Sequence, residues 1–297
     1  MELHEPATGN HYTVTHAPLL KRYAVIGNPI EHSRSPFIHE QFGLQTGLAL
    51  RYEKIKAPLD GFTPVVTDFF AQGGCGLNVT VPFKEEAFAL AQAHLSVRAR
   101  LAGAVNTLWM EQGKIHGCNT DGVGLLNDLL RLGYSPQGKN ILLVGAGGAA
   151  RGVVFPLLEA GCMQLHIVNR TEQRARQLQE HIVSRMPQLA SRLSAGGLAQ
   201  ASGQWDIVIN ATSSSLGTTP PDLPHGLYRH GALAYDMMYG QQATSFMIQA
   251  QEQGAGLTAD GLGMLVGQAA ASFAIWHGVN PDIQAVLHDL RRQLHSA

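Results

Sequence analysis

The chain has 297 residues, of which 45% are apolar and 14% charged, enough for about two domains with sizeable hydrophobic cores. The formal net charge of −1 gives no electrostatic reason to expect nucleic acid or an anionic membrane as a partner. Three widely spaced cysteines, Cys75, Cys118 and Cys162, argue against a disulfide framework or a metal site and for a reducing, cytoplasmic location.

The N-terminal part of the chain predicts a disordered extension, then a strand and a loop rich in polar groups. Residues 1–20 are polar and irregular and show no signal peptide. Residues 23–27 form a buried strand, and the loop 28–36 leads into a helix. Ser33 and Ser35 in this loop can face a polyol or carboxylate substrate, or they can only cap the helix and shape the turn.

A strand over 48–55 and a helix over 61–70 precede a short strand that Pro82 ends. Asn78 and Thr80 alternate with apolar residues, so both side chains are expected on one side of that strand. Lys84 then stands at the start of the next helix.

Two further polar residues follow apolar runs. Asn106 comes near the end of the Ala/Gly/Val-rich segment 101–108, and Asp121 ends the segment 114–121 just before a helix over 123–132. Asp121 can be the N-cap of that helix, or it can be a carboxylate that takes part in catalysis. The residue type alone leaves both possibilities open.

The segment 141–152 predicts a dinucleotide site. Four apolar residues of a buried strand are followed by Gly-x-Gly-x-x-Ala and then by apolar residues at helical spacing. Gly145 permits a tight turn, Gly147 lets the backbone approach a pyrophosphate, and Ala150 lets the helix pack closely on the strand. The helix N-terminus offers free N–H groups and a partial positive charge to phosphates.

The end of the next strand, 165–168, predicts which dinucleotide is bound. NAD-binding folds usually place Asp or Glu here to accept hydrogen bonds from the ribose. This chain has Asn169, followed by Arg170 and Arg174, and two guanidinium groups suit a 2′-phosphate. NADP(H) is therefore expected, the alternative being a solvated, basic helix start.

Strands over 207–211 and 232–236 continue the alternation of strands and helices, which predicts a parallel sheet. The polar segments 210–215 and 236–240 follow these strands, where ligands bind in such sheets.

Two helices are expected over 261–276 and 282–294, after a glycine-containing crossing at 254–263. The uncharged run 261–276 is too short, and too rich in Gly, Gln and Ser, to span a bilayer.

Taken together, eight segments that run in order from about residue 23 to the C-terminus resemble the shikimate dehydrogenase family. They are Gly27-Asn28-Pro29 with Ser33-x-Ser35-Pro36, Asn78-Val-Thr-Val-Pro-Phe-Lys84, Gly103-Ala-Val-Asn106-Thr, Asn119-Thr-Asp121-Gly, Gly145-Ala-Gly-Gly-Ala-Ala-Arg151, Asn169-Arg-Thr171, Asp236-Met-Met-Tyr239 and Asp260-Gly-x-Gly-Met-Leu-Val-Gly-Gln268. Two departures from the family pattern are Val97, where members often have an acidic residue, and Ala150, where many have Ser.

The resemblance implies an α/β fold in which an N-terminal α/β substrate domain is followed by a doubly wound, Rossmann-type NADP domain, with C-terminal helices that pack back on the first. The expected divisions are 21–121 plus 258–297 for the substrate domain and 122–257 for the NADP domain. The implied reaction is the reversible reduction of 3-dehydroshikimate to shikimate with NADPH, on the route to chorismate.

The resemblance also implies roles for individual residues. Lys84 and Asp121 would be the catalytic pair, and no metal is expected. The substrate would be held by Ser33, Ser35, Asn78, Thr80, Lys84, Asn106, Asp121, Tyr239 and Gln268. The cofactor would be held by Gly145, Ala146, Gly147, Gly148, Ala149, Asn169, Arg170, Thr171, Arg174, Met237 and Gly261.

The chemistry agrees with this, since hydride reduction of a ketone places negative charge on its oxygen, which a Lys can stabilise and a neighbouring carboxylate can help to position. The expected partner is a small-molecule substrate, and the expected state a monomer or homodimer. Two alternatives stay open: a quinate or bispecific quinate/shikimate dehydrogenase, and a non-catalytic NADP sensor on the same fold. Both Lys84 and Asp121 are present, which argues against the sensor.

Overall fold

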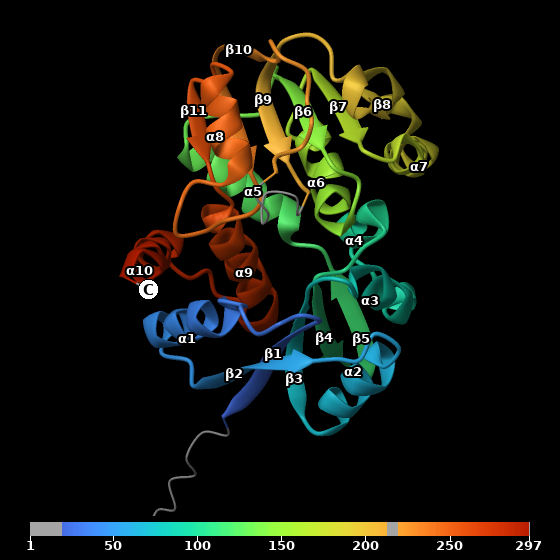
Figure 1. Cartoon of the computed structure of the whole chain (residues 1–297). Helices are drawn as coiled ribbons and strands as arrows, with labels where there is room; N and C mark the ends of the chain where they lie inside the picture. Colours follow the sequence, from blue (N-terminus) through green and yellow to red (C-terminus); the bar gives the residue numbers. More distant parts are fainter. Residues whose placement is uncertain (1–19, 213–218, 297) are drawn as a thin grey trace, which may run out of the picture.

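The computed structural model describes residues 20–212 and 219–296, and it contains two β-sheets, one above the other in Figure 1. The lower sheet has the strand order β2-β1-β3-β4-β5. Its strands are β1 (Lys21–Gly27), β2 (Leu50–Lys56), β3 (Gly74–Val79), β4 (Thr107–Glu111) and β5 (Lys114–Cys118). Strands β1, β2 and β3 pair in parallel, whereas β4 pairs antiparallel with both β3 and β5.

The upper sheet has the order β11-β10-β9-β6-β7-β8, and all its pairs are parallel. Its strands are β6 (Asn140–Val144), β7 (Gln164–Asn169), β8 (Leu193–Gly197), β9 (Trp205–Asn210), β10 (Tyr228–Asp236) and β11 (Leu257–Ala259). Ile141 and Leu143 of β6 belong to one hydrophobic cluster, and Leu142 and Val144 to another. Both faces of the sheet are therefore covered at β6, which explains why this strand is continuously apolar.

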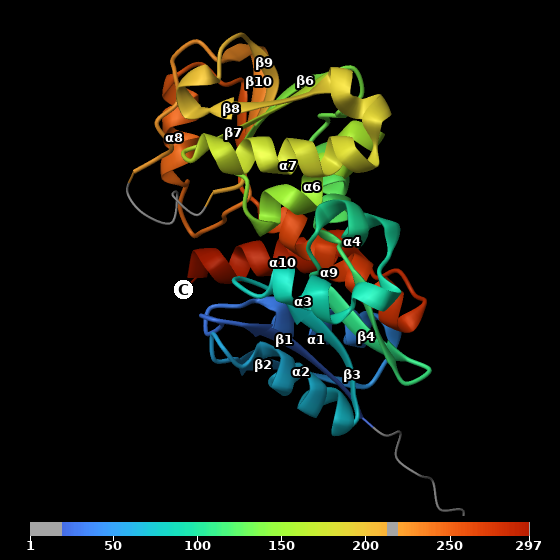
Figure 2. The ribbon, with the colours of Figure 1, turned by 90° about the vertical axis from the view of Figure 1, so that its right-hand side faces the viewer.

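Helices surround both sheets, and the views in Figures 1 and 2 place α9 and α10 at mid-height, between the sheets. The helices are α1 (Ser35–Thr46), α2 (Phe62–Ala71), α3 (Lys84–Leu90), α4 (Val97–Ala102), α5 (Asp121–Arg131), α6 (Gly148–Glu159), α7 (Glu172–Arg185), α8 (Ser245–Glu252), α9 (Leu262–His277) and α10 (Ile283–Ser296). Apolar residues of α9 and α10 share a buried cluster with Ile38 and Phe42 of α1. The last two helices thus return to the N-terminal sheet.

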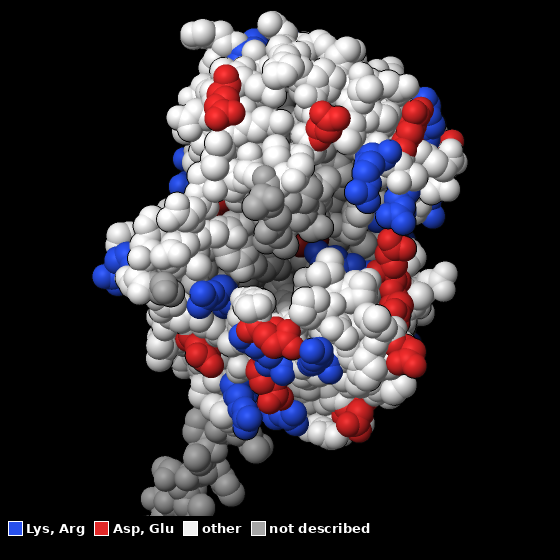
Figure 3. All heavy atoms as spheres, in the orientation of Figure 1, with Lys and Arg blue, Asp and Glu red and all other residues white. Residues whose placement is uncertain are grey.

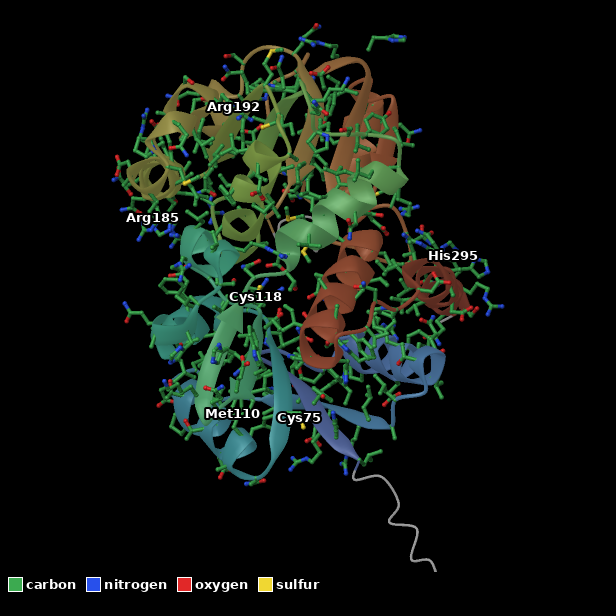
Figure 4. The ribbon with its side chains drawn as sticks, turned by 180° about the vertical axis from the view of Figure 1, so that it is seen from behind. Cys75, Met110, Cys118, Arg185, Arg192 and His295 are labelled. Atoms are coloured by element: carbon green, nitrogen blue, oxygen red, sulfur yellow. The ribbon has the colours of Figure 1, made fainter. Side chains whose placement is uncertain are left out.

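Helix α5 packs against both α6 and α9 at the junction of the sheets, which Figure 4 shows from behind. Glycines allow these helices to approach closely. A Cβ at Gly263 of α9 would overlap the Asp128 carboxylate of α5, and a Cβ at Gly124 would lie 2.6 Å from the Met264 carbonyl oxygen. Asp128 itself is buried and accepts a hydrogen bond from Tyr235 of β10 at 2.7 Å. The junction is therefore a packed interface in which a larger side chain has no room.

The expected α/β class and the expected parallel strands of the second half are confirmed. Four elements were not anticipated: the edge strands β8 and β11, the short helix α4, and the β4–β5 hairpin, whose antiparallel pairing departs from simple strand–helix alternation. The helix predicted over 123–132 begins instead at Asp121. The predicted extension, apart from Leu20, and the serines Ser213, Ser214 and Ser215 lie outside the described residues.

All three cysteines are free, Cys118 and Cys162 being buried; Figure 4 shows Cys75 and Cys118 well separated along the lower half of the molecule. Among residues 20–212 and 219–296, no helix is both long and apolar enough to cross a membrane.

Candidate active site

A cavity of about 430 Å³ lies between the two sheets, visible as a hollow at mid-height in Figure 3, with charged atoms at its floor. The walls come from the loop after β1, the segment from β3 to α3, the first turn of α6, the segments after β9 and β10, and the first half of α9. All nine residues expected to hold the substrate line it: Ser33, Ser35, Asn78, Thr80, Lys84, Asn106, Asp121, Tyr239 and Gln268.

An ion pair between Lys84 and Asp121 forms part of this cavity. Lys84 Nζ donates a hydrogen bond to Asp121 Oδ2 at 2.6 Å. The two side chains are 14% and 7% exposed, so the pair is nearly removed from solvent while still lining the cavity. A charged pair of this kind can meet a polar substrate atom without long-range screening by water.

Asp121 is the first residue of α5 rather than its N-cap, and its carboxylate accepts hydrogen bonds from side chains outside the helix. The position before it, Thr120, makes no side-chain cap. Asp121 Oδ1 accepts from Asn106 Nδ2 at 2.9 Å, and Oδ2 accepts from Lys84. The helix-cap interpretation of Asp121 is therefore wrong, because both carboxylate oxygens face the cavity's polar groups.

Asn106 forms hydrogen bonds with several segments around the Lys84–Asp121 pair. Its Oδ1 accepts from the backbone N–H of Thr120 at 2.9 Å, and its Nδ2 lies 3.4 Å from Gln268 Oε1 of α9. Asn106 is 2% exposed. The amide thus holds the start of α5 in place and links it to α9.

Asn78 is largely committed to the protein framework. Its Oδ1 accepts from the Tyr52 hydroxyl at 2.7 Å, while its Nδ2 donates to Ser272 Oγ at 2.9 Å and to the Asn106 carbonyl oxygen at 3.2 Å. Both amide hydrogens have partners, so toward a ligand Asn78 can offer only a lone pair of Oδ1.

Ser33 and Ser35 line the cavity, and Ser33 also shapes the turn. Ser33 Oγ accepts from the backbone N–H of Ser35 at 3.3 Å. Ser35 is the first residue of α1, and the helix has no side-chain cap at Arg34. Ser33 therefore shapes the turn and also lines the cavity, whereas Ser35 does not cap the helix.

Tyr239, from the segment after β10, lines the same cavity. Burial raises the pKa of the Tyr239 phenol, and the positive charge of Arg34 acts in the opposite direction. The phenol is therefore a neutral hydrogen-bonding group at physiological pH.

The glycine loop joins the strand β6 to α6 beside Lys84. Gly145 has φ +118°, a conformation that glycine adopts without strain. A Cβ at Gly147 would meet no atom within 4 Å, and α6 begins at Gly148 with no side chain capping its N-terminus. A Cβ at Gly148 would lie 3.5 Å from Lys84 Cδ. The open loop and free helix terminus fit a pyrophosphate, and they lie against the Lys84 side chain.

The basic group at the end of β7 is exposed. Asn169 Nδ2 donates to the Thr171 carbonyl oxygen at 2.9 Å, which shapes the turn into α7. Arg170 and Arg174 are exposed and, within the described residues, neither forms an ion pair. Figure 3 shows basic side chains gathered on this part of the upper lobe, beside the hollow. Two free guanidinium groups here fit a 2′-phosphate.

The last two expected cofactor residues also lie at the cavity. Met237 follows β10, and Gly261 precedes α9; both line the cavity, as does Ala149. A Cβ at Gly261 would overlap the Met237 backbone, so the two segments touch. By contrast, the other cofactor residues lie outside the cavity lining, in the glycine loop and at the end of β7: Gly145, Ala146, Gly147, Gly148, Asn169, Arg170, Thr171 and Arg174.

Some residues at the site were not anticipated from the sequence. Arg34 and His32 line the cavity, and Ser272 and Thr107 form a buried hydrogen bond at 2.7 Å behind it. Arg34 stands between two predicted substrate residues, a signal that was available. Ser272 stands one helical turn after Gln268, but only the tertiary packing of α9 on β4 reveals its partners.

Comparison with known proteins identifies the family. Three family models match in order: the shikimate dehydrogenase substrate binding domain over residues 25–108, shikimate / quinate 5-dehydrogenase over 130–219 and the shikimate 5′-dehydrogenase C-terminal domain over 261–291. A shikimate dehydrogenase (NADP(+)) of Bordetella avium is 62% identical over 281 residues, which cover 95% of this chain and 99% of that protein.

Solved structures agree. The shikimate 5-dehydrogenase of Thermus thermophilus, in complex with NADP(H) and shikimate, is 33% identical with a TM-score of 0.81, covering 93% of this chain and 100% of that one. An Ael1 enzyme from Pseudomonas putida is 44% identical with a TM-score of 0.82, covering 91% and 98%. Sequence and fold match along nearly the whole chain, and the protein belongs to the shikimate dehydrogenase family.

Proposed function

We infer that this protein catalyses the reversible, NADPH-dependent reduction of 3-dehydroshikimate to shikimate, a step of aromatic biosynthesis. The observation that carries this inference is the Lys84–Asp121 pair, which lies in one cavity with many small hydroxyl and amide groups and directly beside the glycine loop. The relatives named as NADP-dependent shikimate dehydrogenases, at 51–62% identity, support it.

When bound, NADPH would supply the hydride that reduces the substrate ketone. Lys84 and Asp121 would be the catalytic pair: the Lys84 ammonium stabilises the negative charge that develops on the ketone oxygen and exchanges a proton with it. Asp121 holds Lys84 in place through its 2.6 Å contact. Asn106, bonded to the other carboxylate oxygen, keeps Asp121 from turning away.

The remaining site residues fall into two groups. Ser33, Ser35, Thr80, Tyr239 and Gln268 would bind the substrate's carboxylate and ring hydroxyls, with Asn78 as an acceptor beside them. The pyrophosphate would lie on the loop 145–149, the 2′-phosphate on Asn169, Arg170, Thr171 and Arg174, and the nicotinamide beside Met237 and Gly261. The open geometry of the glycine loop supports this placement.

The domain division follows the two sheets. We place the substrate domain at 21–121 plus 258–297 and the NADP domain at 122–257, since the last two helices share a core with α1. The residues that line the cavity all come from one chain. The site would therefore be complete in a monomer and in each protomer of a homodimer. Three free cysteines support a cytoplasmic location.

The decisive test is the reduction of NADP⁺ by the purified protein with shikimate and, separately, with quinate. We expect turnover with shikimate and a kcat/KM for quinate lower by about ten- to a hundredfold, since the extra quinate hydroxyl would be buried without a partner. Equal kcat/KM values would support the bispecific enzyme instead. No turnover with either substrate would support a non-catalytic NADP sensor.

A further inference from the structure

The charges that line the cavity do not cancel. The side chains with full charges among its lining residues are Lys84, Asp121 and Arg34, together with the titratable His32. Lys84 and Asp121 neutralise each other in their ion pair. The cavity therefore keeps one uncompensated positive charge, that of Arg34.

Among residues 20–212 and 219–296, no contact explains the charge of Arg34. It occupies the N-cap position of α1, but only its carbonyl oxygen is used, accepting from the backbone N–H of Ile38 at 3.2 Å. Its side chain makes no cap, and within the described residues the guanidinium forms no ion pair. The residue is partly buried, and no carboxylate of the described residues forms an ion pair with it.

The surroundings of Arg34 are those expected of an anion-binding site. Ser33 and Ser35 flank it in the sequence, and all three residues line the cavity. The charge of Arg34 and the opposite charge of Asp260, which is paired with Arg291, both act on the Tyr239 phenol, which also lines the cavity. This part of the wall thus combines one cation with three neutral hydroxyl groups.

A wall of neutral hydroxyl groups would hold a carboxylate through hydrogen bonds alone. Taking a carboxylate out of water is costly unless a cation or several hydrogen bonds compensate, and hydroxyl groups supply no net charge. We propose that Arg34 is the residue that pairs with the carboxylate of the substrate and makes the enzyme select acids over uncharged cyclic polyols. This proposal rests on the proposed function, which supplies the carboxylate-bearing substrate.

The test compares shikimate with its methyl ester, which lacks the negative charge. Arg34→Gln removes the cation, Arg34→Lys keeps it, and Arg98→Gln removes an exposed cation outside the cavity as a matched control. KM and kcat are measured for both compounds, with the KM for NADP⁺ and the melting temperature alongside.

For shikimate, we expect Arg34→Gln to raise KM about tenfold with kcat within about twofold of the parent, since the partly exposed charge binds rather than reacts. For the methyl ester, KM should change less than about twofold, because no carboxylate is left to pair. Arg34→Lys should recover most of the loss, and Arg98→Gln should change neither substrate's KM. An equal effect of Arg34→Gln on shikimate and its ester would overturn the proposal.

Ionic strength gives a second readout that does not depend on turnover of the ester. Raising the salt concentration from about 0.05 M to about 0.5 M should raise the KM for shikimate in the parent protein and much less in Arg34→Gln, since screening acts on charge pairs. The same salt response in both would contradict the proposal. A parent protein inactive on shikimate would instead refute the proposed function, so the two failures are distinguishable.

Discussion

Lys84 Nζ lies 2.6 Å from Asp121 Oδ2, and this contact joins the first residue of α3 to the first residue of α5. A cation is unfavourable at a helix N-terminus, whereas an anion is favourable there, so Asp121 offsets the repulsion between Lys84 and its own helix. The contact also links two segments 37 residues apart, one on each side of the β4–β5 hairpin. The Lys84–Asp121 ion pair thus depends on how this hairpin folds.

Lys84→Ala should lower kcat by about 10²–10⁴-fold, since it removes the group that we propose exchanges the proton. Lys84→Arg should be poor as well, because a guanidinium keeps the charge but cannot release a proton. Steady-state kinetics with shikimate and NADP⁺ give the result. A kcat near that of the parent for Lys84→Ala would remove Lys84 from the mechanism.

Asp121→Asn should impair both KM for shikimate and kcat, because it removes the charge that holds Lys84. It should also lower the melting temperature, because it leaves the nearly buried Lys84 ammonium without its counter-charge. A lower melting temperature with unchanged kinetics would show that Asp121 stabilises the fold and takes no part in catalysis.

Arg170→Ala and Arg174→Ala should each raise the KM for NADP⁺ about ten- to a hundredfold and leave that for NAD⁺ nearly unchanged, because only NADP⁺ carries the 2′-phosphate. Arg176→Ala is the matched control: this arginine lies on the same helix as Arg174 but is ion-paired with Glu172. Equal losses for both cofactors would mean that the arginines are structural.

Gly263→Ala should destabilise the protein by about 1–3 kcal/mol, because the added methyl group would overlap the buried carboxylate of Asp128. Chemical denaturation measures the difference. Gly197→Ala serves as control, since a Cβ there would meet its nearest atom at 3.4 Å. Similar stability of Gly263→Ala and the parent would show that α5 and α9 can move apart at no cost.

His39 should make the protein less stable in acid. Burial lowers the pKa of His39 from 6.5 to about 3, with the Asn78 amide opposing this to a lesser extent. Between these values the unfolded chain binds a proton that the folded protein does not, so stability falls as the pH drops below 6.5, by up to about 1.4 kcal/mol per pH unit.

His39→Phe tests this effect. Phenylalanine can keep the stacking on Tyr52, where the His39 ring centroid lies at 4.3 Å, and cannot be protonated. Denaturation curves at several pH values below 6.5 should show a shallower loss of stability in this variant. A pH dependence unchanged from that of the parent would show that other groups cause it, such as His277, whose pKa burial lowers to about 4.

Ser33→Ala and Ser35→Ala should each raise the KM for shikimate more than they lower kcat, because these hydroxyls bind but do not react. Loss of the 3.3 Å bond to the Ser35 N–H should cost Ser33→Ala little stability, since the turn retains its backbone hydrogen bond from Ser33 N to the Ile30 carbonyl oxygen at 3.1 Å. A large drop in melting temperature with an unchanged KM would assign Ser33 to the turn alone.

The sequence by itself determined the elements whose signals are local. The glycine loop follows directly from a buried strand and a helix, and Gly145 adopts a positive φ, as the tight turn requires. The family could also be recognised, because its motifs are short and lie in order along the chain. Such features depend on neighbours a few residues away, which a sequence displays.

Only the tertiary structure decided what depends on distant partners. It showed that Asp121 does not cap its helix, because the chain folds Asn106 and Lys84 around its carboxylate. It also showed that both amide hydrogens of Asn78 are bound within the protein. One acceptor is Ser272 of α9, 194 residues away in the sequence. Burial and hydrogen bonding between segments set these roles, and no local pattern encodes which donor a folded chain brings to which acceptor.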